Sequence, residues 1–190
     1  MKKKIKEIYG SNIDTFYIDN YYDSKLNENF IVTCNRNHIN IFSFLKSSLF
    51  KKYNAADCGE INDFIVDERG SIKKLLGSCY YGIIIWDFYT GKLLKQIMSN
   101  IGGIYGLCLF NNNYLLAGNN NYIILIDLIN EKIVNKISSN QEKEISRIKA
   151  IDTKNGKIFI CGGRWECDII FLENKELKFS IKNRIRINNI

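Results

Sequence analysis

The chain has 190 residues, of which 46% are hydrophobic and 25% charged, with a formal net charge of +7. This apolar content excludes an intrinsically disordered chain, and its longest apolar runs, such as residues 80–86, are too short to span a membrane. Six cysteines without a Cys-x-x-Cys pair, beside a single histidine, argue against a zinc site, and we expect no metal or cofactor.

Four similar segments follow one another along the chain, at residues 30–44, 74–88, 114–128 and 157–171. Each begins with an apolar strand that ends in small residues, and continues through a polar turn into a second strand that ends in an aromatic residue or isoleucine. A further turn leads to an outer strand, at 93–98 and 133–138, and another strand lies between repeats, at 61–66 and 104–110. This pattern predicts four strands per repeat.

One position of the repeat is occupied by Phe42, Trp86, Ile126 and Ile170, which are spaced 44, 40 and 44 residues apart. A period of about 40–45 residues is typical of one four-stranded sheet per repeat. We therefore expect a single all-β domain over residues 1–190, with approximate repeats at 10–53, 54–98, 99–138 and 139–187.

Residues 83–92, Ile-Ile-Ile-Trp-Asp-Phe-Tyr-Thr-Gly-Lys, resemble the most recognisable line of the WD-repeat β-propeller family, and residues 123–128 are similar. The resemblance covers roughly residues 13–187. It implies β-propeller blades of four antiparallel strands, about four in number, as in a partial or half propeller. It also implies that Asp87 and Asp127 accept hydrogen bonds from backbone N–H groups of the following turns.

The chain departs from the family in its polar residues. Only one repeat keeps the Trp-Asp pair, and none has the Gly-His dipeptide. The family's hydrogen-bond network of His, Ser, Asp and Trp is therefore missing, although Asn120 stands where it could replace the Asp in part. We expect packing to hold the blades without that polar tie.

Four blades are about half of the family's usual ring. Residues 4–9 and 178–187 both have the pattern of outer strands, which gives one outer strand too many for a closed four-bladed ring. Three interpretations stay open. The chain is a fragment of a larger protein, or it pairs with itself or another chain to complete a ring, or it closes as a small ring with a spare terminal strand.

Catalytic constellations are absent from the sequence. A serine or cysteine triad needs a histidine base, and His38 is the single histidine. No phosphate-binding loop occurs, because the two Gly-Gly pairs, Gly102-Gly103 and Gly162-Gly163, are not followed by Lys-Ser or Lys-Thr. We therefore expect that the protein is not an enzyme. We also expect its cysteines to be free thiols and the protein to lie in the cytoplasm, with the nucleus as the alternative compartment.

The turns between the two middle strands of each repeat are the candidate binding surface, because in a propeller they gather on one face. Tyr, Trp and Arg contribute most to interface energetics. The predicted partner-binding residues are Arg36, His38, Tyr80, Tyr81, Asn120, Tyr122, Arg164 and Trp165. For Trp165 the competing interpretation is that its side chain folds back over the blade.

Two functions compete at this stage. The repeats favour a non-catalytic protein-interaction scaffold whose partners are other proteins. The alternative is a polyanion-binding propeller that recognises RNA or anionic lipid through its basic residues, which are densest at 2–6 and 178–186. Salt dependence would separate the two functions, because phosphate contacts weaken steeply as salt is added.

Overall fold

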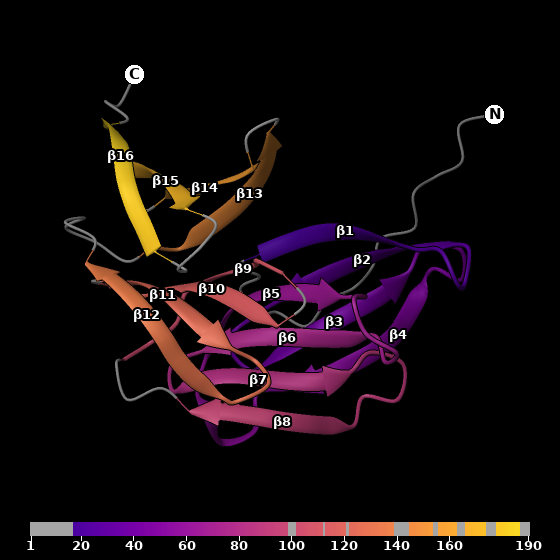
Figure 1. The fold of residues 1–190 in the computed structure, drawn as a ribbon. Coiled ribbons are helices and arrows are strands. Elements are labelled where there is room, and N and C mark those ends of the chain that lie inside the picture. Colours follow the sequence, from indigo (N-terminus) through magenta and orange to yellow (C-terminus); the bar gives the residue numbers. More distant parts are fainter. Residues whose placement is uncertain are drawn as a thin grey trace.

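The computed structural model describes residues 17–98, 102–111, 113–120, 122–138, 145–153, 156–162, 166–173 and 178–186. These residues form four antiparallel sheets of four strands each (Figure 1), which confirms the expected all-β fold class. Within the described ranges one short 3-10 turn, Ala56–Cys58, interrupts the strands. No helix there is long and apolar enough to cross a membrane. The expected strand at 4–9 lies outside the described residues.

Each sheet is built from four strands that are consecutive in the chain and pair in sequence order. The first sheet contains β1 (Tyr17–Asp23), β2 (Glu28–Cys34), β3 (His38–Ser43) and β4 (Ser48–Asn54). The second contains β5 (Ile61–Asp67), β6 (Lys74–Cys79), β7 (Gly82–Asp87) and β8 (Leu93–Met98). The third contains β9 (Gly106–Leu109), β10 (Tyr114–Gly118), β11 (Tyr122–Asp127) and β12 (Lys132–Ser138). The fourth contains β13 (Arg147–Thr153), β14 (Gly156–Gly162), β15 (Glu166–Glu173) and β16 (Lys178–Arg186).

The position shared by Phe42, Trp86, Ile126 and Ile170 is the same structural position in all four sheets. In each sheet the register between the third and fourth strands shifts directly before this residue. Each of the four also faces the second strand of its sheet, at Ile31, Leu75, Leu115 and Phe159 respectively. The repeat spacing therefore follows a bulge that recurs once per sheet.

The turn after this position is held by a side-chain acceptor. Asp87 accepts hydrogen bonds from the backbone N–H groups of Tyr89 and Thr90, at 3.0 and 2.7 Å. Asp127 accepts from Ile129 and Asn130 at 2.8 and 2.9 Å. These bonds lower the pKa of both carboxyl groups. Each Asp thus closes the turn that leads into the outer strand of its sheet.

The core lies between neighbouring sheets, because each sheet presents apolar side chains on both faces. Trp86 is buried in the cluster shared by the first and second sheets, where its ring lies 5.7 Å from that of Tyr53. The ring occupies the space above Gly77, where an added Cβ would lie 2.9 Å from the Trp86 Cζ3 atom. Gly77, near the end of β6, therefore leaves room for the Trp86 indole.

The antiparallel order gives every sheet two ends. We call one end the turn face; it carries the turns after the first and third strands, such as β1–β2 and β3–β4. The other end is the connector face, which carries the turns between the middle strands, such as β2–β3 and β6–β7, and the connectors that lead to the next sheet. The predicted binding turns of the first three sheets belong to the connector face.

Candidate functional site

The connector face is organised by backbone hydrogen bonds between the middle turns and the connectors beside them. The carbonyl oxygen of Arg36 accepts from the N–H of Ile61 at 2.9 Å. In the next sheet, the N–H groups of Tyr80 and Tyr81 donate to Glu60 and Cys58, at 3.2 and 2.9 Å. The connector 55–60 therefore joins the binding turns of the first and second sheets.

Tyr80 and Tyr81 are the most conspicuous side chains of this face. They are 52% and 50% exposed, and their rings meet edge to face with centroids 5.1 Å apart. The connector approaches them so closely at Gly59 that an added Cβ would lie 2.9 Å from the Tyr80 Cβ. Gly59 also has a φ of +84°, which disfavours any other residue there.

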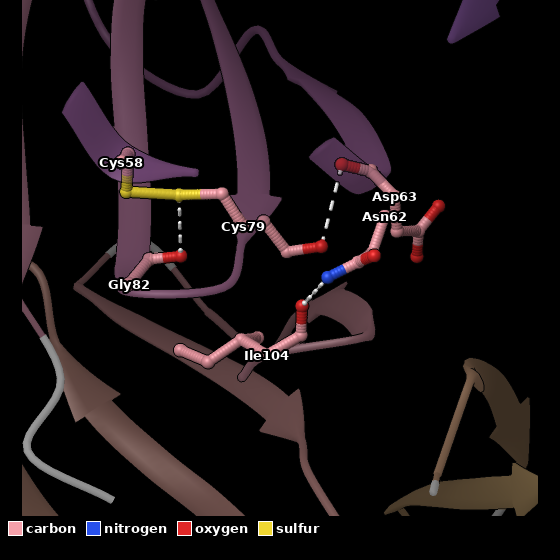
Figure 2. The surroundings of a disulfide bond; sticks show 7 residues. Cys58, Asn62, Asp63, Cys79, Gly82 and Ile104 are labelled. Carbon is pink, nitrogen blue, oxygen red and sulfur yellow. Dashed lines mark hydrogen bonds between the residues drawn. A yellow bond between two sulfur atoms is a disulfide. The ribbon is translucent and has the colours of Figure 1, made fainter. Parts of the chain in front are cut away.

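A disulfide bond between Cys58 and Cys79 joins the connector to the residue directly before the tyrosine pair (Figure 2). The expectation of free thiols is therefore wrong for these two cysteines. The sequence could not reveal the pair, because the two residues meet only when the connector folds over the β6–β7 turn. Cys34, in contrast, is a buried thiol whose pKa burial raises to about 12.

Neighbouring polar residues tie the same region to the third sheet. The Asn62 side chain donates to the carbonyl oxygen of Ile104 at 2.8 Å (Figure 2). The Ser78 hydroxyl donates to the carbonyl oxygen of Asp63 at 3.4 Å. The backbone N–H of Ile104 in turn donates to Cys79 at 3.1 Å. The turn that carries the tyrosines is thus anchored on both sides.

Four of the predicted binding residues are brought together around the connector. Arg36 lies 3.5 Å from Glu60, and both side chains are exposed. His38 borders a shallow pocket together with Asn54, Gly59 and Glu60. Burial and the nearby Lys52 ammonium lower the pKa of His38. Arg36, His38, Tyr80 and Tyr81 therefore share one surface.

The other predicted residues are placed elsewhere or not described. Asn120 is exposed at the β10–β11 turn of the third sheet. The Tyr122 ring is half-buried and lies 4.9 Å from the Lys136 ammonium. Arg164 and Trp165 lie outside the described residues.

A cavity that the sequence did not indicate lies where the four inner strands meet. Its lining comes from β1, β5, β9 and β13, and includes Tyr17, Asp63, Leu107 and Arg147. The Arg147 guanidinium stacks over the Tyr17 ring at 4.1 Å, and its Nη1 lies 3.9 Å from Asp63 Oδ1. These contacts link the fourth sheet to the first and the second.

Asp63 is the buried centre of this arrangement. Its two oxygens accept from the backbone N–H groups of Phe64 and Leu107, at 2.9 and 3.0 Å. Burial raises the pKa of this carboxyl to about 6, against the opposing effects of the Leu107 hydrogen bond and the Arg147 charge. The folded state therefore holds the Asp63 proton more tightly than the unfolded state does.

This difference predicts a pH dependence of stability. The contribution of Asp63 is fully present below pH 3.8, its usual pKa, and is lost as the pH rises through about 6. We expect Asp63 by itself to make the free energy of unfolding, measured by urea denaturation, about 1.5 kcal/mol higher at pH 5 than at pH 8. Carboxyl groups with lowered pKa values, such as Asp23 and Asp127, act at lower pH and do not interfere in this window.

His38 opposes the effect, since its lowered pKa makes its contribution fade as the pH falls through 6.5. The comparison should therefore be made in a His38→Gln background, with and without Asp63→Asn. The pH slope should disappear in the Asp63→Asn chain. Equal slopes in both chains would show that Asp63 does not titrate in this range.

A second polar cluster, which the sequence did not indicate, lies on the turn face. Lys73 is almost fully buried, and its ammonium lies 2.8 Å from Asp23 Oδ2 and 2.5 Å from Glu68 Oε1. It also donates to the Tyr21 hydroxyl at 2.6 Å, and the Tyr89 hydroxyl donates to Asp23 at 2.9 Å. A polar tie therefore joins the first and second sheets, although it differs from the one in the WD-repeat family.

Within the described residues, no three His, Cys, Asp or Glu side chains gather in a way that could hold a metal ion. The chain matches no family model and no curated protein sequence. Its likeness to known proteins is therefore a likeness of structure.

Among solved structures, the WD40 beta propeller domain of Doa1 aligns with a TM-score of 0.66 at 14% identity, over 82% of this chain and 50% of that one. The chain has a β-propeller fold. The computationally designed Ika4 protein aligns with a TM-score of 0.61 at 12% identity, over 99% of this chain and 100% of its own. The designed Ika8 protein aligns at 0.60 and 12% identity, over 87% and 48%. The propeller thus spans about half the length of the Doa1 domain and of Ika8, and all of Ika4.

Proposed function

We propose that this propeller is a non-catalytic protein-interaction scaffold and that Tyr80 and Tyr81 form the centre of its binding surface. The observation that carries the proposal is an exposed aromatic pair on a rigid turn. Each ring leaves half of its surface in water, whereas most other aromatic side chains of the second sheet pack inward. Exposed aromatic groups of this kind favour a protein partner.

Preorganisation supports the same conclusion. The backbone at both tyrosines is bonded to the connector, and the disulfide holds the residue before them. A partner would therefore meet a turn whose backbone position is already fixed, so less conformational entropy would be lost on binding. Arg36 and His38 border the pair and could supply polar contacts at its edge.

The test compares partner capture by the wild-type chain and by a Tyr80→Ala/Tyr81→Ala variant, using the native extract as the source of partners. We expect partners to be lost or bound at least tenfold more weakly, because truncating such central aromatic residues typically costs about 2 kcal/mol or more. The melting temperature should change little, since both side chains are largely exposed.

A matched control is Tyr22→Ala, which removes a tyrosine of similar exposure, 52%, from the opposite end of the first sheet. This variant should keep every partner. If the double variant melts normally and retains the same partners as the wild type, the tyrosine pair is not the binding surface. Partners lost equally from both variants would also contradict the proposal.

A further inference from the structure

Each inner sheet of the propeller packs on its two neighbours through two different faces. In the second sheet, Leu75 and Trp86 are buried in the cluster shared with the first sheet, whereas Leu76 belongs to the cluster shared with the third. The third sheet repeats this arrangement with Ile126 and Leu125. We call the face that contacts the preceding sheet the backward face, and the face that contacts the following sheet the forward face. Every interface between consecutive sheets therefore joins a forward face to a backward face.

The backward face of the first sheet has no such partner. Phe42 occupies the position that Trp86 has in the second sheet, and Ile31 lies opposite Phe42 as Leu75 lies opposite Trp86. Trp86 and Leu75 are 3% and 0% exposed, whereas both residues of the first sheet are partly exposed. In the part of the chain that the structure describes, neither belongs to a core cluster. The first sheet thus carries half of an interface whose other half is not supplied by a described sheet.

The apolar residues of this backward face are neighbours on the sheet. Ile31, Phe42 and Leu49 lie opposite one another on β2, β3 and β4. Side chains in such a cross-strand row have Cβ atoms about 4.5–5.5 Å apart. Leu49 is 50% exposed, and Ile18, on the same face of β1, is 64% exposed. The backward face is therefore one surface that exposes apolar side chains from all four strands, as interaction sites do.

The fourth sheet has the complementary free face. In the first three sheets, the second-strand residue that opposes the position before the bulge lies on the forward face and is fully buried, at Val32, Leu76 and Leu116. Ile160 has that position in the fourth sheet and is partly exposed. Ile151, on the same face of β13, is 46% exposed. The forward face of the fourth sheet is therefore uncovered among the described residues.

The contact between the first and fourth sheets at the cavity leaves both of these faces free. Arg147 reaches the Tyr17 ring from β13, and Lys149 also lines the cavity. Tyr17, however, packs on the forward face of the first sheet. The first and fourth sheets stand at the two ends of the series (Figure 1), and no described core cluster combines them. Among the described residues, the series of sheets is therefore open between them.

We propose that two copies of this chain join head to tail, with the forward face of the fourth sheet of each copy packed on the backward face of the first sheet of the other. The occupant is a second copy because, within this chain, backward faces are covered by forward faces, and the fourth sheet carries a free one. The two equal interfaces leave neither face uncovered, so the assembly closes at two copies.

The length of the chain is consistent with this assembly. Two copies would together match the length of the Doa1 domain or of Ika8, of which one copy spans about half, while Ika4 is matched by one copy. The tyrosine pair Tyr80 and Tyr81 belongs to neither of the joined faces, so the proposed binding surface would stay accessible in the pair. The dimer therefore does not depend on the proposed function.

The test is the mass of the full chain in solution, measured by analytical ultracentrifugation over a range of concentrations. We expect a species of twice the 22.1 kDa of one chain and none larger. Phe42→Glu and Ile160→Glu each place a carboxylate in one of the two joined faces. Each should weaken dimerisation at least about tenfold, because an unpaired charge would be buried in the interface.

Mixing the two variants tests the head-to-tail arrangement. In the mixture, the intact fourth sheet of the Phe42→Glu chain can pack on the intact first sheet of the Ile160→Glu chain, so the mixture should dimerise more tightly than either variant alone. Circular dichroism and the melting temperature would verify that each variant folds. Leu49→Glu, at a half-exposed residue of the same row as Phe42, should act in the same way and replaces Phe42→Glu if that chain does not fold.

The control is Ile129→Glu, which changes a residue that is 63% exposed on a turn of the third sheet and belongs to neither joined face. This variant should dimerise as the wild type does. A wild type that stays monomeric at every concentration would overturn the proposal, and so would a mixture that dimerises no better than its components. Loss of the dimer in Phe42→Glu but not in Ile160→Glu would mean that first sheets pair with each other. A mass that grows beyond two copies would mean an open filament. Either result would contradict the head-to-tail pair.

Discussion

Replacing Lys73 with methionine should lower the free energy of unfolding by about 3–5 kcal/mol, because the change leaves a buried carboxylate without its cation. Asp23 is fully buried and lies 2.8 Å from the Lys73 ammonium, which is itself 9% exposed. The Tyr21, Phe88 and Tyr89 rings surround the ammonium within 5.6 Å, so methionine fits the apolar part of the site but supplies no charge. Urea denaturation monitored by circular dichroism would measure the loss.

Two further chains separate the charge effect from a general one. In Lys73→Met/Asp23→Asn the unpaired charge is gone while an oxygen remains to accept the Leu26 N–H, so most of the lost stability should return. Lys92→Met removes an exposed lysine and should change stability by less than about 0.5 kcal/mol. Equal losses from Lys73→Met and Lys92→Met would show that the cluster does not hold the sheets together.

The repetitive part of the fold was predictable because residues close together in the sequence determine it. The strand that contains Trp86 and the strand that contains Ile126 each combine an apolar run, the residue at the recurring bulge and the Asp that follows it within a few positions. The structure places these residues at one bulge per sheet and one capped turn. Local patterns of this kind suffice for four-stranded sheets in series.

The contacts between sheets were not predictable, because they join residues far apart in the chain. Lys73 and Asp23 are 50 residues apart, and Cys58 and Cys79 are 21 apart. Neither pair belongs to a short motif. The sequence therefore led to the expectation of free thiols, which is wrong for Cys58 and Cys79, and it gave no sign of the Lys73 cluster.

One signal in the sequence could have indicated the central cavity. Asp63 directly precedes an apolar run, Phe64 to Val66, in the strand that starts at Ile61. A carboxylate in an inner strand needs buried partners, and the structure supplies two backbone N–H groups and Arg147. Which residues those are depends on how the sheets meet, and that information is not local.

Replacing Trp86 with alanine should cost about 3–5 kcal/mol, the usual range for removing a large aromatic side chain from a core. Trp86 is 3% exposed in the cluster between the first and second sheets, where its ring packs beside Tyr53 and above Gly77. Urea denaturation would measure the loss. Tyr81→Ala removes an aromatic ring that is half exposed, and it should cost much less.

A double-mutant cycle tests whether the indole occupies the space above Gly77. In the wild type, Gly77→Ala would place a methyl group 2.9 Å from Trp86 Cζ3 and 3.3 Å from Ile39 Cδ1, so it should be destabilising. In the Trp86→Ala chain the same methyl group meets a cavity, so Gly77→Ala should cost less or become stabilising. The two changes should therefore be coupled by at least about 0.5 kcal/mol. If the stability effects of the two substitutions simply add, the indole does not lie over Gly77. The presence of glycine at this position would then need another explanation.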